Sequence, residues 1–245
     1  MTKGAFFWRK SNSFLPFANF APDQVIFNGR IRVFIEFFYI RPFKTPSDLD
    51  KAIIIQRVAD ILKETPSAQD IVKKGPKRNE RFLYLARHMV EKAIAKDALI
   101  TSHGGLGIAI LFRTNAKDKN FWKEILDEIG LVRKVTGVKN ALKILKNQKY
   151  IKKQRPKEGD YLYCWFWGIV KDDRGPGTQI AASMKDELLR ISEKEQLPIY
   201  AETRLKTNAV VYRRYKFELF HTWKQPDGAT MWFLRYIPKS LQGKK

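Results

Sequence analysis

The sequence predicts an α/β protein, and three features of one stretch indicate this class. Residues 161–170 form an uncharged apolar and aromatic run containing Gly168, which is typical of a central strand buried on both faces. A charged turn with Gly175 and Gly177 follows. The next segment, residues 180–191, carries apolar residues at helical spacing. The predicted order is therefore strand, glycine turn and helix.

This order of elements could create a phosphate site. The first N–H groups of a helix have no internal partner and lie at the positive end of the helix dipole, where they can hold an anion. Glycines in the preceding turn let a ligand approach the main chain. An Arg-Gly-x-Gly turn also arises by chance and is then only a turn. The pattern alone leaves both interpretations open.

The composition indicates a folded and strongly basic protein. The 245 residues are 44% apolar and 13% aromatic, which is sufficient for a real core. A net charge of +22 suits nucleic acid, an anionic membrane or a polyphosphorylated small molecule. The single cysteine, Cys164, excludes a disulfide framework and is expected to be inert packing. Because the longest apolar run is about half a bilayer span, we expect a soluble, cytoplasmic protein.

The first half of the chain predicts a strand and two helices. Residues 1–30 are an N-terminal extension of uncertain order, and residues 31–40 are strand-like. Ser47 is a candidate N-cap for a helix that runs to about Leu62. A second amphipathic helix covers residues 78–96.

A hairpin and a basic helix are predicted next. Strands at residues 98–102 and 106–112 are joined by a glycine turn. Residues 114–157 contain 13 Lys or Arg and 4 Asp or Glu, a local excess of nine positive charges. An apolar stripe through this segment predicts a helix with one basic, wet face. That face is either simply solvated or an anion-binding surface.

The last part of the chain predicts a strand, a helix and a closing hairpin. A strand covers residues 197–203, and a short helix covers residues 207–215. Two strands near residues 217–223 and 229–236 are joined through a Pro-Asp-Gly turn. Residues 238–245 form a basic tail. No Cys/His spacing suggests a metal site.

With these elements in order, residues 161–236 resemble the GNAT superfamily of acetyl-CoA-dependent N-acetyltransferases, in particular its small bacterial members. In that family a Gln or Arg, two residues, a Gly, one residue and a Gly or Ala follow the fourth strand; here Arg174, Gly175 and Gly177 fit. Downstream, residues 199–203 and then Asn208 with Tyr212 resemble the fifth strand and fourth helix of the family.

Two residues depart from the family pattern. Gln179 stands where the family has a small residue, and its side chain either crowds the pyrophosphate loop or points outward. Lys216 replaces the glycine that normally precedes the next Phe. If that position needs a positive φ, a lysine there costs on the order of 1 kcal/mol.

The resemblance implies a mixed, mostly antiparallel sheet of about six to seven strands flanked by helices, with the central parallel pair splayed for CoA. This domain would cover residues 31–237, and Gly168 would ease the distortion of the central strand. The oxyanion donors would come from the end of that strand. The implied cofactor-binding residues are Ile169, Val170, Lys171, Arg174, Gly175, Pro176, Gly177, Thr178, Gln179 and Asn208.

The same resemblance implies direct transfer of an acetyl group from acetyl-CoA to a primary amine. Tyr212 aligns with the tyrosine that protonates the leaving thiolate, although core packing is the alternative for this residue. Glu202 is the candidate base, or else a paired or solvent-facing carboxylate. Glu36 is a second candidate, and water could also accept the proton.

The expected partner is a small-molecule amine or a peptide acceptor, with no membrane contact, and the protein is expected to be a monomer or homodimer. The competing hypothesis is a catalytically degraded GNAT fold that binds nucleic acid or another polyanion, motivated by Gln179, Lys216 and the basic segment. We rank the enzyme first, because aromatic residues are not interleaved with the basic run as single-strand binders require.

Overall fold

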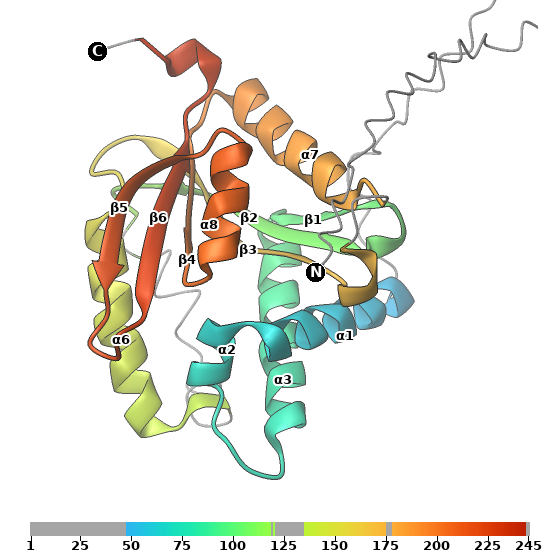
Figure 1. The fold of residues 1–245 in the computed structure, drawn as a ribbon. Helices are drawn as coiled ribbons and strands as arrows, with labels where there is room; N and C mark the ends of the chain where they lie inside the picture. Colours follow the sequence, from blue (N-terminus) through green and yellow to red (C-terminus); the bar gives the residue numbers. More distant parts are fainter. Residues whose placement is uncertain (1–47, 119, 121–134, 175–177, 244–245) are drawn as a thin grey trace, which may run out of the picture. The chain divides into compact units, whose positions relative to one another are not determined.

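The computed structural model describes residues 48–118, 120, 135–174 and 178–243. Within these residues the chain forms one six-stranded mixed sheet with helices on its faces, as predicted (Figure 1). The strand order is β1-β2-β3-β4-β6-β5, and β3–β4 is the parallel pair in an otherwise antiparallel sheet. The strands are β1 Leu99–Thr101, β2 Gly107–Asn115, β3 Asp160–Ile169, β4 Ile199–Thr203, β5 Glu218–Lys224 and β6 Thr230–Tyr236.

The helices confirm the predicted amphipathic segments and add one. They are α1 Asp48–Glu64, α2 Pro66–Ile71, α3 Arg78–Ala95, α6 Val138–Lys153, α7 Ile180–Glu195 and α8 Lys206–Arg214. The sequence did not predict α2 as a separate helix. Thr65, extended at φ −88° and ψ 117°, separates it from α1 because Pro66 disfavours helical geometry in the preceding residue. The predicted strand at residues 31–40, its Glu36 and the Ser47 cap lie outside the described residues.

Alternation along β2 explains how the sheet is covered on both faces. Ile108, Ile110 and Phe112 belong to a core with α1 and α3. Ala109 and Leu111 belong to a second core with α7 and α8. Successive residues of a strand point to opposite faces, so an uninterrupted apolar run is what a strand covered on both faces needs. None of the described helices combines the length and hydropathy needed to span a membrane.

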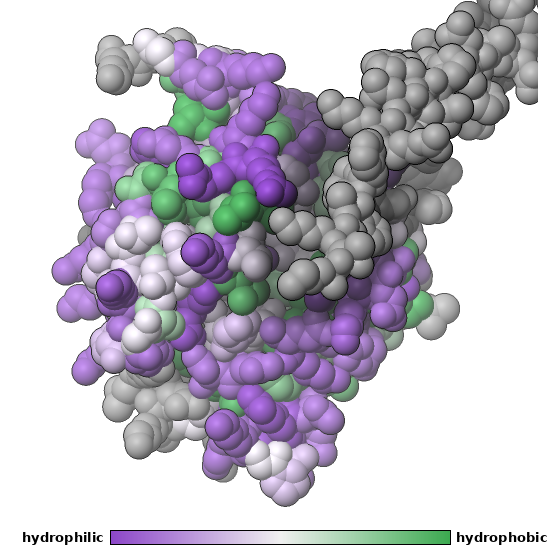
Figure 2. Space-filling view, in the orientation of Figure 1, coloured by the Kyte–Doolittle hydropathy of each residue, from purple (hydrophilic) through white to green (hydrophobic). Residues whose placement is uncertain are grey.

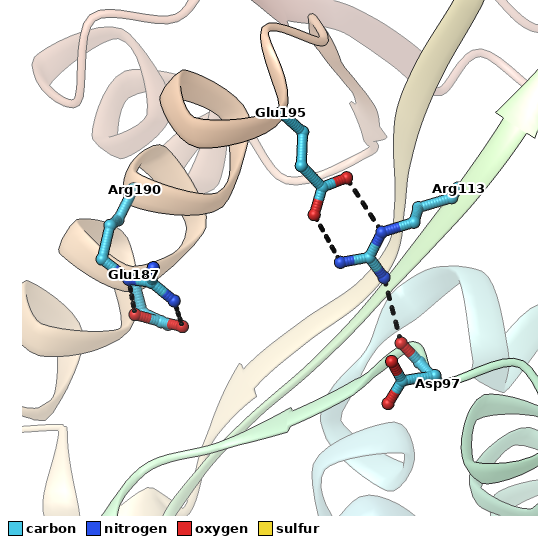
Figure 3. A network of polar contacts seen from close by, with 5 residues as sticks. All are labelled: Asp97, Arg113, Glu187, Arg190 and Glu195. Carbon is cyan, nitrogen blue, oxygen red and sulfur yellow. Dashed lines mark hydrogen bonds and ion pairs between the residues drawn. The ribbon is translucent and has the colours of Figure 1, made fainter. Parts of the chain in front are cut away.

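A polar network ties the end of α7 to β2 (Figure 3). The Arg113 guanidinium donates two hydrogen bonds to Glu195, at 2.8 and 2.5 Å, and a third to the Asp97 carbonyl at 3.1 Å. Within α7, Arg190 donates to Glu187 in the same two-pronged geometry, at 2.7 and 2.6 Å. Bidentate pairs of this kind fix orientation as well as distance. The C-terminal end of α7 is therefore anchored to the sheet.

The parallel pair β3–β4 separates after two residue pairs. Leu162 is opposite Ile199 and Tyr163 is opposite Tyr200, and the Leu162 N–H donates to the Pro198 carbonyl at 2.8 Å. Beyond this point β3 continues to Ile169 without pairing with β4. The structure thus has the splayed central pair that the sequence predicts.

The distortion of β3 lies at Trp165, so the prediction that placed it at Gly168 is wrong. The register shifts so that Ile110 opposes Phe166 while Leu111 opposes Cys164, which leaves Trp165 as the extra residue of a bulge. Gly168 remains in register. A Cβ at Gly168 would approach Ile61 Cγ2 to 2.7 Å, so the glycine permits close packing of α1 on β3.

Lys216 adopts φ +67°, which confirms the left-handed geometry that the sequence suggested for this position. We expect Lys216→Gly to raise the free energy of unfolding by about 1 kcal/mol, because glycine carries no Cβ penalty at positive φ. Urea denaturation measures the change. Lys216→Ala is the matched control, since it removes the same side chain and keeps the Cβ. Equal effects of the two substitutions would contradict backbone strain at this residue.

Candidate active site

A cavity of about 310 Å³ lies where β3 and β4 separate. Its volume falls within the range of small-molecule sites. The predicted residues Glu202, Asn208 and Tyr212 all line it. So do Trp165 and Trp167 of β3, together with residues of α1, α2, α3 and α6. The structure therefore brings three sequence-predicted site residues into one aromatic-walled cavity.

The face of the molecule around α8 is mixed in polarity. Figure 2 shows mainly hydrophilic side chains at the periphery and hydrophobic ones gathered towards the middle. Val210 and Val211 of α8 are among the exposed apolar residues. Asn208 and Tyr212 are one turn apart on the same helix. The helix that contributes these two cavity residues thus also presents apolar surface.

Aromatic packing holds the phenol of Tyr212 towards β3. The ring makes edge contacts with Trp167 at 5.4 Å and with Phe217 at 5.0 Å between centroids. Its hydroxyl lies 4.0 Å from Cys164 Sγ. Burial, followed by the nearby Cys164 thiol, raises the pKa of Tyr212 well above 10. The phenol is therefore neutral at pH 7 and retains a proton that it can donate.

Cys164 is not equipped to act as a nucleophile. Burial raises the pKa of its thiol from 9.0 to about 12, although the hydrogen bond with Tyr212 acts in the opposite direction. The thiolate is the reactive form of cysteine, so this thiol is unreactive at neutral pH. The finding agrees with the packing role that the sequence predicts.

The raised pKa of Cys164 gives a testable dependence of stability on pH. Above pH 9 the unfolded thiol ionises while the folded thiol keeps its proton, so stability falls as the pH rises towards 12. We expect this group to remove about 2 kcal/mol of stability at about pH 10.5. In urea denaturation, Cys164→Ala should lose less stability than the parent between about pH 7.5 and 10.5. Parallel losses would show that the thiol does not cause the decline.

Glu202 forms a buried cluster with Arg155 and Tyr163. Glu202 Oε1 accepts hydrogen bonds from Arg155 Nη2 at 3.0 Å and from the Tyr163 hydroxyl at 2.5 Å. The Arg155 guanidinium also lies 3.8 Å from the Tyr163 ring centroid. The side chains of Arg155 and Glu202 are only 4% and 14% exposed. Burial, and then the Glu202 charge, raises the pKa of Tyr163 well above 10, so this phenol is neutral.

In this cluster one oxygen of Glu202, Oε1, is already committed to two hydrogen bonds. Within the described residues Glu202 Oε2 has no hydrogen-bond donor, so that oxygen remains for a ligand. Sequence reasoning missed Arg155, because only the fold brings the segment after α6 next to β4.

Ile169, Val170 and Lys171 lie beyond the cavity rather than in its lining. Ile169 ends β3 opposite Gly107. The Val170 N–H donates to the Leu106 carbonyl at 2.9 Å, and Lys171 begins a 3₁₀ turn. The Val170 amide is thus already paired in this structure, and the roles of all three residues stay predictions.

Cys164 lines the cavity, and the pairing of β3 indicates the direction of its main-chain amide. The Leu162 N–H points towards β4, and the Leu111 N–H donates to Ala98 of β1. Because Leu111 faces Cys164 as a non-hydrogen-bonded pair, alternation along β3 directs the Cys164 N–H away from β2 and towards β4. In that direction β4 no longer pairs with it. Sequence reasoning missed this donor, because the separation of β4 from β3 after Tyr163 is a property of the fold.

Around the predicted phosphate turn the structure describes Arg174, Thr178 and Gln179. Arg174 donates from Nε to the Ile169 carbonyl at 2.8 Å and from Nη1 to Glu64 at 2.6 Å. Thr178 donates to the Asp173 carbonyl at 2.8 Å. Gln179 is the N-cap residue of α7, in left-handed geometry at φ +52°. Gly175, Pro176 and Gly177 lie outside the described residues.

No protein-family model matches the sequence, and no curated protein matches it. The fold does match solved structures. The C-terminal condensation domain of Ebony in complex with beta-alanyl-dopamine gives a TM-score of 0.57 at 12% identity, covering 80% of this chain and 97% of that one. A histone acetyltransferase HPA2 and related acetyltransferase from Corynebacterium glutamicum gives a TM-score of 0.55 at 15% identity, and the match covers 79% of this chain and 93% of that one. A putative arylalkylamine N-acetyltransferase 7 from the yellow fever mosquito gives a TM-score of 0.50 at 13% identity, and the match covers 78% of this chain and 85% of that one.

Proposed function

We propose that the protein is an N-acetyltransferase that moves the acetyl group of acetyl-CoA directly to a primary amine. Its fold is similar to that of solved acetyltransferases. The observation that carries the proposal is the position of Tyr212, Glu202 and the Cys164 amide around one cavity at the splay of β3 and β4. A direct transfer needs a proton donor, an oxyanion donor and a polar group for the amine, and these three groups supply them.

The proposed transfer balances with the residues described. The amine attacks the thioester carbonyl, so the C–N bond forms and the Cys164 N–H stabilises the oxyanion. When the C–S bond breaks, the leaving thiolate takes a proton from Tyr212, and the resulting phenolate regains one from water before the next turnover. The ammonium proton leaves to water or to Glu202 Oε2, which accepts no hydrogen bond from the described residues. The reaction passes through no covalent enzyme intermediate, in keeping with the raised pKa of the Cys164 thiol.

The remaining predicted residues would hold the diphosphate of acetyl-CoA. The turn from Arg174 to Gln179, with the N-terminus of α7, is the proposed seat for this group. Asn208 would contact the pantetheine arm, because it lines the cavity one turn before Tyr212. Ile169, Val170 and Lys171 would lie along the same path at the end of β3. Gln179 is uncharged, so at this turn it could offer the diphosphate hydrogen bonds only.

The proposed acceptors are small amines or peptides, and the cavity favours those with an aromatic group. Trp165, Phe166 and Trp167 all line the cavity, and aromatic pairs add to the free energy of burial. Asp70 and Glu202 also line the cavity, where they are ion-paired with Arg204 and Arg155. Their oxygens could accept hydrogen bonds from an amine. Nucleic-acid binding without catalysis is the second candidate, and it leaves the convergence of Tyr212, Glu202 and Asn208 unexplained.

Two measurements test the proposal. Isothermal titration of the folded full chain with acetyl-CoA should give saturable heat. A panel of arylalkylamines, aliphatic amines and short peptides should then release free thiol from acetyl-CoA at rates above the amine-free background. The absence of heat at high micromolar acetyl-CoA, for protein shown to be folded, would count against any acetyl-CoA-dependent activity. Saturable heat without thiol release would leave a cofactor-binding protein and reject the enzyme.

A further inference from the structure

A second cavity of about 310 Å³ lies near the start of β3, away from the turn that leads into α7. It is lined by residues from the loop after β2, the last turns of α6 and the segment after α6. No residue lines both cavities. The second cavity is therefore separate from the proposed active site.

Positive charge dominates this second cavity. It is lined by the cations Lys149, Lys152, Lys153, Arg155 and Lys157, against one acid, Asp118. The first three recur at i, i+3 and i+4 and so share one face of α6. Within the part of the chain that the structure describes, none of these three lysines forms an ion pair. Like charges one turn apart repel, so an anion in the cavity would relieve this repulsion.

Two of the lining cations are held in place by other contacts. Lys157 Nζ donates to the Lys153 carbonyl at 2.8 Å. Arg155 is fixed by Glu202 and by the ring of Tyr163. A ligand would therefore not have to order these two side chains, which lowers the entropic cost of binding.

We propose that this cavity is a binding site for a small anion that carries two or more phosphate groups. Arg155 is already paired with Glu202, which leaves four lysines around a volume of about 310 Å³, and a short phosphate chain can reach more of these ammonium groups at once than a single phosphate can. The limited volume of the cavity favours a compact ligand over an extended nucleic acid. The site also accounts for part of the basic excess in residues 114–157 that the proposed transfer reaction does not use.

Sodium tripolyphosphate is the probe for a calorimetric test on the full chain at about 0.15 M salt, where long-range attraction is screened. The test variant is Lys149→Gln/Lys152→Gln/Lys153→Gln. The matched control is Lys73→Gln/Lys74→Gln/Lys77→Gln, which removes the same charge from three exposed lysines that do not line the cavity. We expect the test variant to weaken binding at least about tenfold and the control by less than about twofold.

Several outcomes would overturn the proposal. Equal weakening by both triple variants would show diffuse attraction to a basic surface. Orthophosphate binding as tightly as tripolyphosphate would show a site for one phosphate only. No heat from the parent protein would show no site. Loss of tripolyphosphate binding in excess acetyl-CoA would place the probe at the α7 turn. Because the readout is binding of an inorganic anion, a failed acetyltransferase assay would not affect this test.

Discussion

Tyr212→Phe should lower kcat for acetyl transfer by about 10²- to 10³-fold while leaving acetyl-CoA affinity within about threefold of the parent. The substitution removes the proton donor and keeps the ring that packs on Trp167 and Phe217. The leaving group is a thiolate. Without the Tyr212 proton its negative charge develops in a buried site where no acid neutralises it, which raises the barrier to C–S cleavage. Initial rates of thiol release and calorimetry with acetyl-CoA measure the two quantities.

Tyr215→Phe is the matched control for this prediction. Tyr215 directly follows α8 and also stacks on Trp167, at 5.8 Å between centroids, but it does not line the cavity. We expect its loss of hydroxyl to change kcat by less than about twofold. If Tyr212→Phe kept more than about a tenth of the parental kcat, the phenol would not be the acid. Equal losses in both variants would indicate that aromatic packing, not proton donation, matters.

The pH dependence of kcat also tests the role of the Tyr212 hydroxyl. Burial raises the pKa of Tyr212 well above 10, so loss of its proton should not lower kcat between about pH 8 and 10. A descending limb centred in that interval would assign the acid to another group or show that the phenol is hydrated during turnover.

The elements that the sequence predicted are those whose patterns are local. The apolar run that became β3 and the helical spacing that became α7 are visible without any knowledge of the fold. Asn208 and Tyr212 were placed correctly on one helix face, because their spacing is also local. The left-handed geometry of Lys216 was raised only as a condition, from the glycine that the resembling family has at this position, and the structure shows it.

The parts that the sequence could not predict depend on contacts between distant segments. The β3 bulge lies at Trp165 because of how β3 registers with β2, and a glycine alone did not mark it. Arg155 reaches Glu202 across 47 residues, from a segment whose composition suggested only a basic surface. Pairing across such a distance has no periodic signature, so the structure was needed to see that Glu202 is a paired carboxylate.

The Arg155–Glu202 pair carries the largest expected effect on stability. Arg155→Met should lower the free energy of unfolding by about 3–5 kcal/mol, because it leaves the Glu202 charge buried without its counterion. Arg155→Met/Glu202→Gln should recover most of this loss, because it removes the second charge as well. Urea denaturation of the two single variants and the double variant measures the coupling.

The exposed pair Arg174–Glu64 provides the control for burial. Its side chains are 42% and 41% exposed, so Arg174→Met should cost less than about 1 kcal/mol. A double variant no more stable than Arg155→Met would mean that Arg155 stabilises the fold through its packing on Tyr163 and not through the carboxylate.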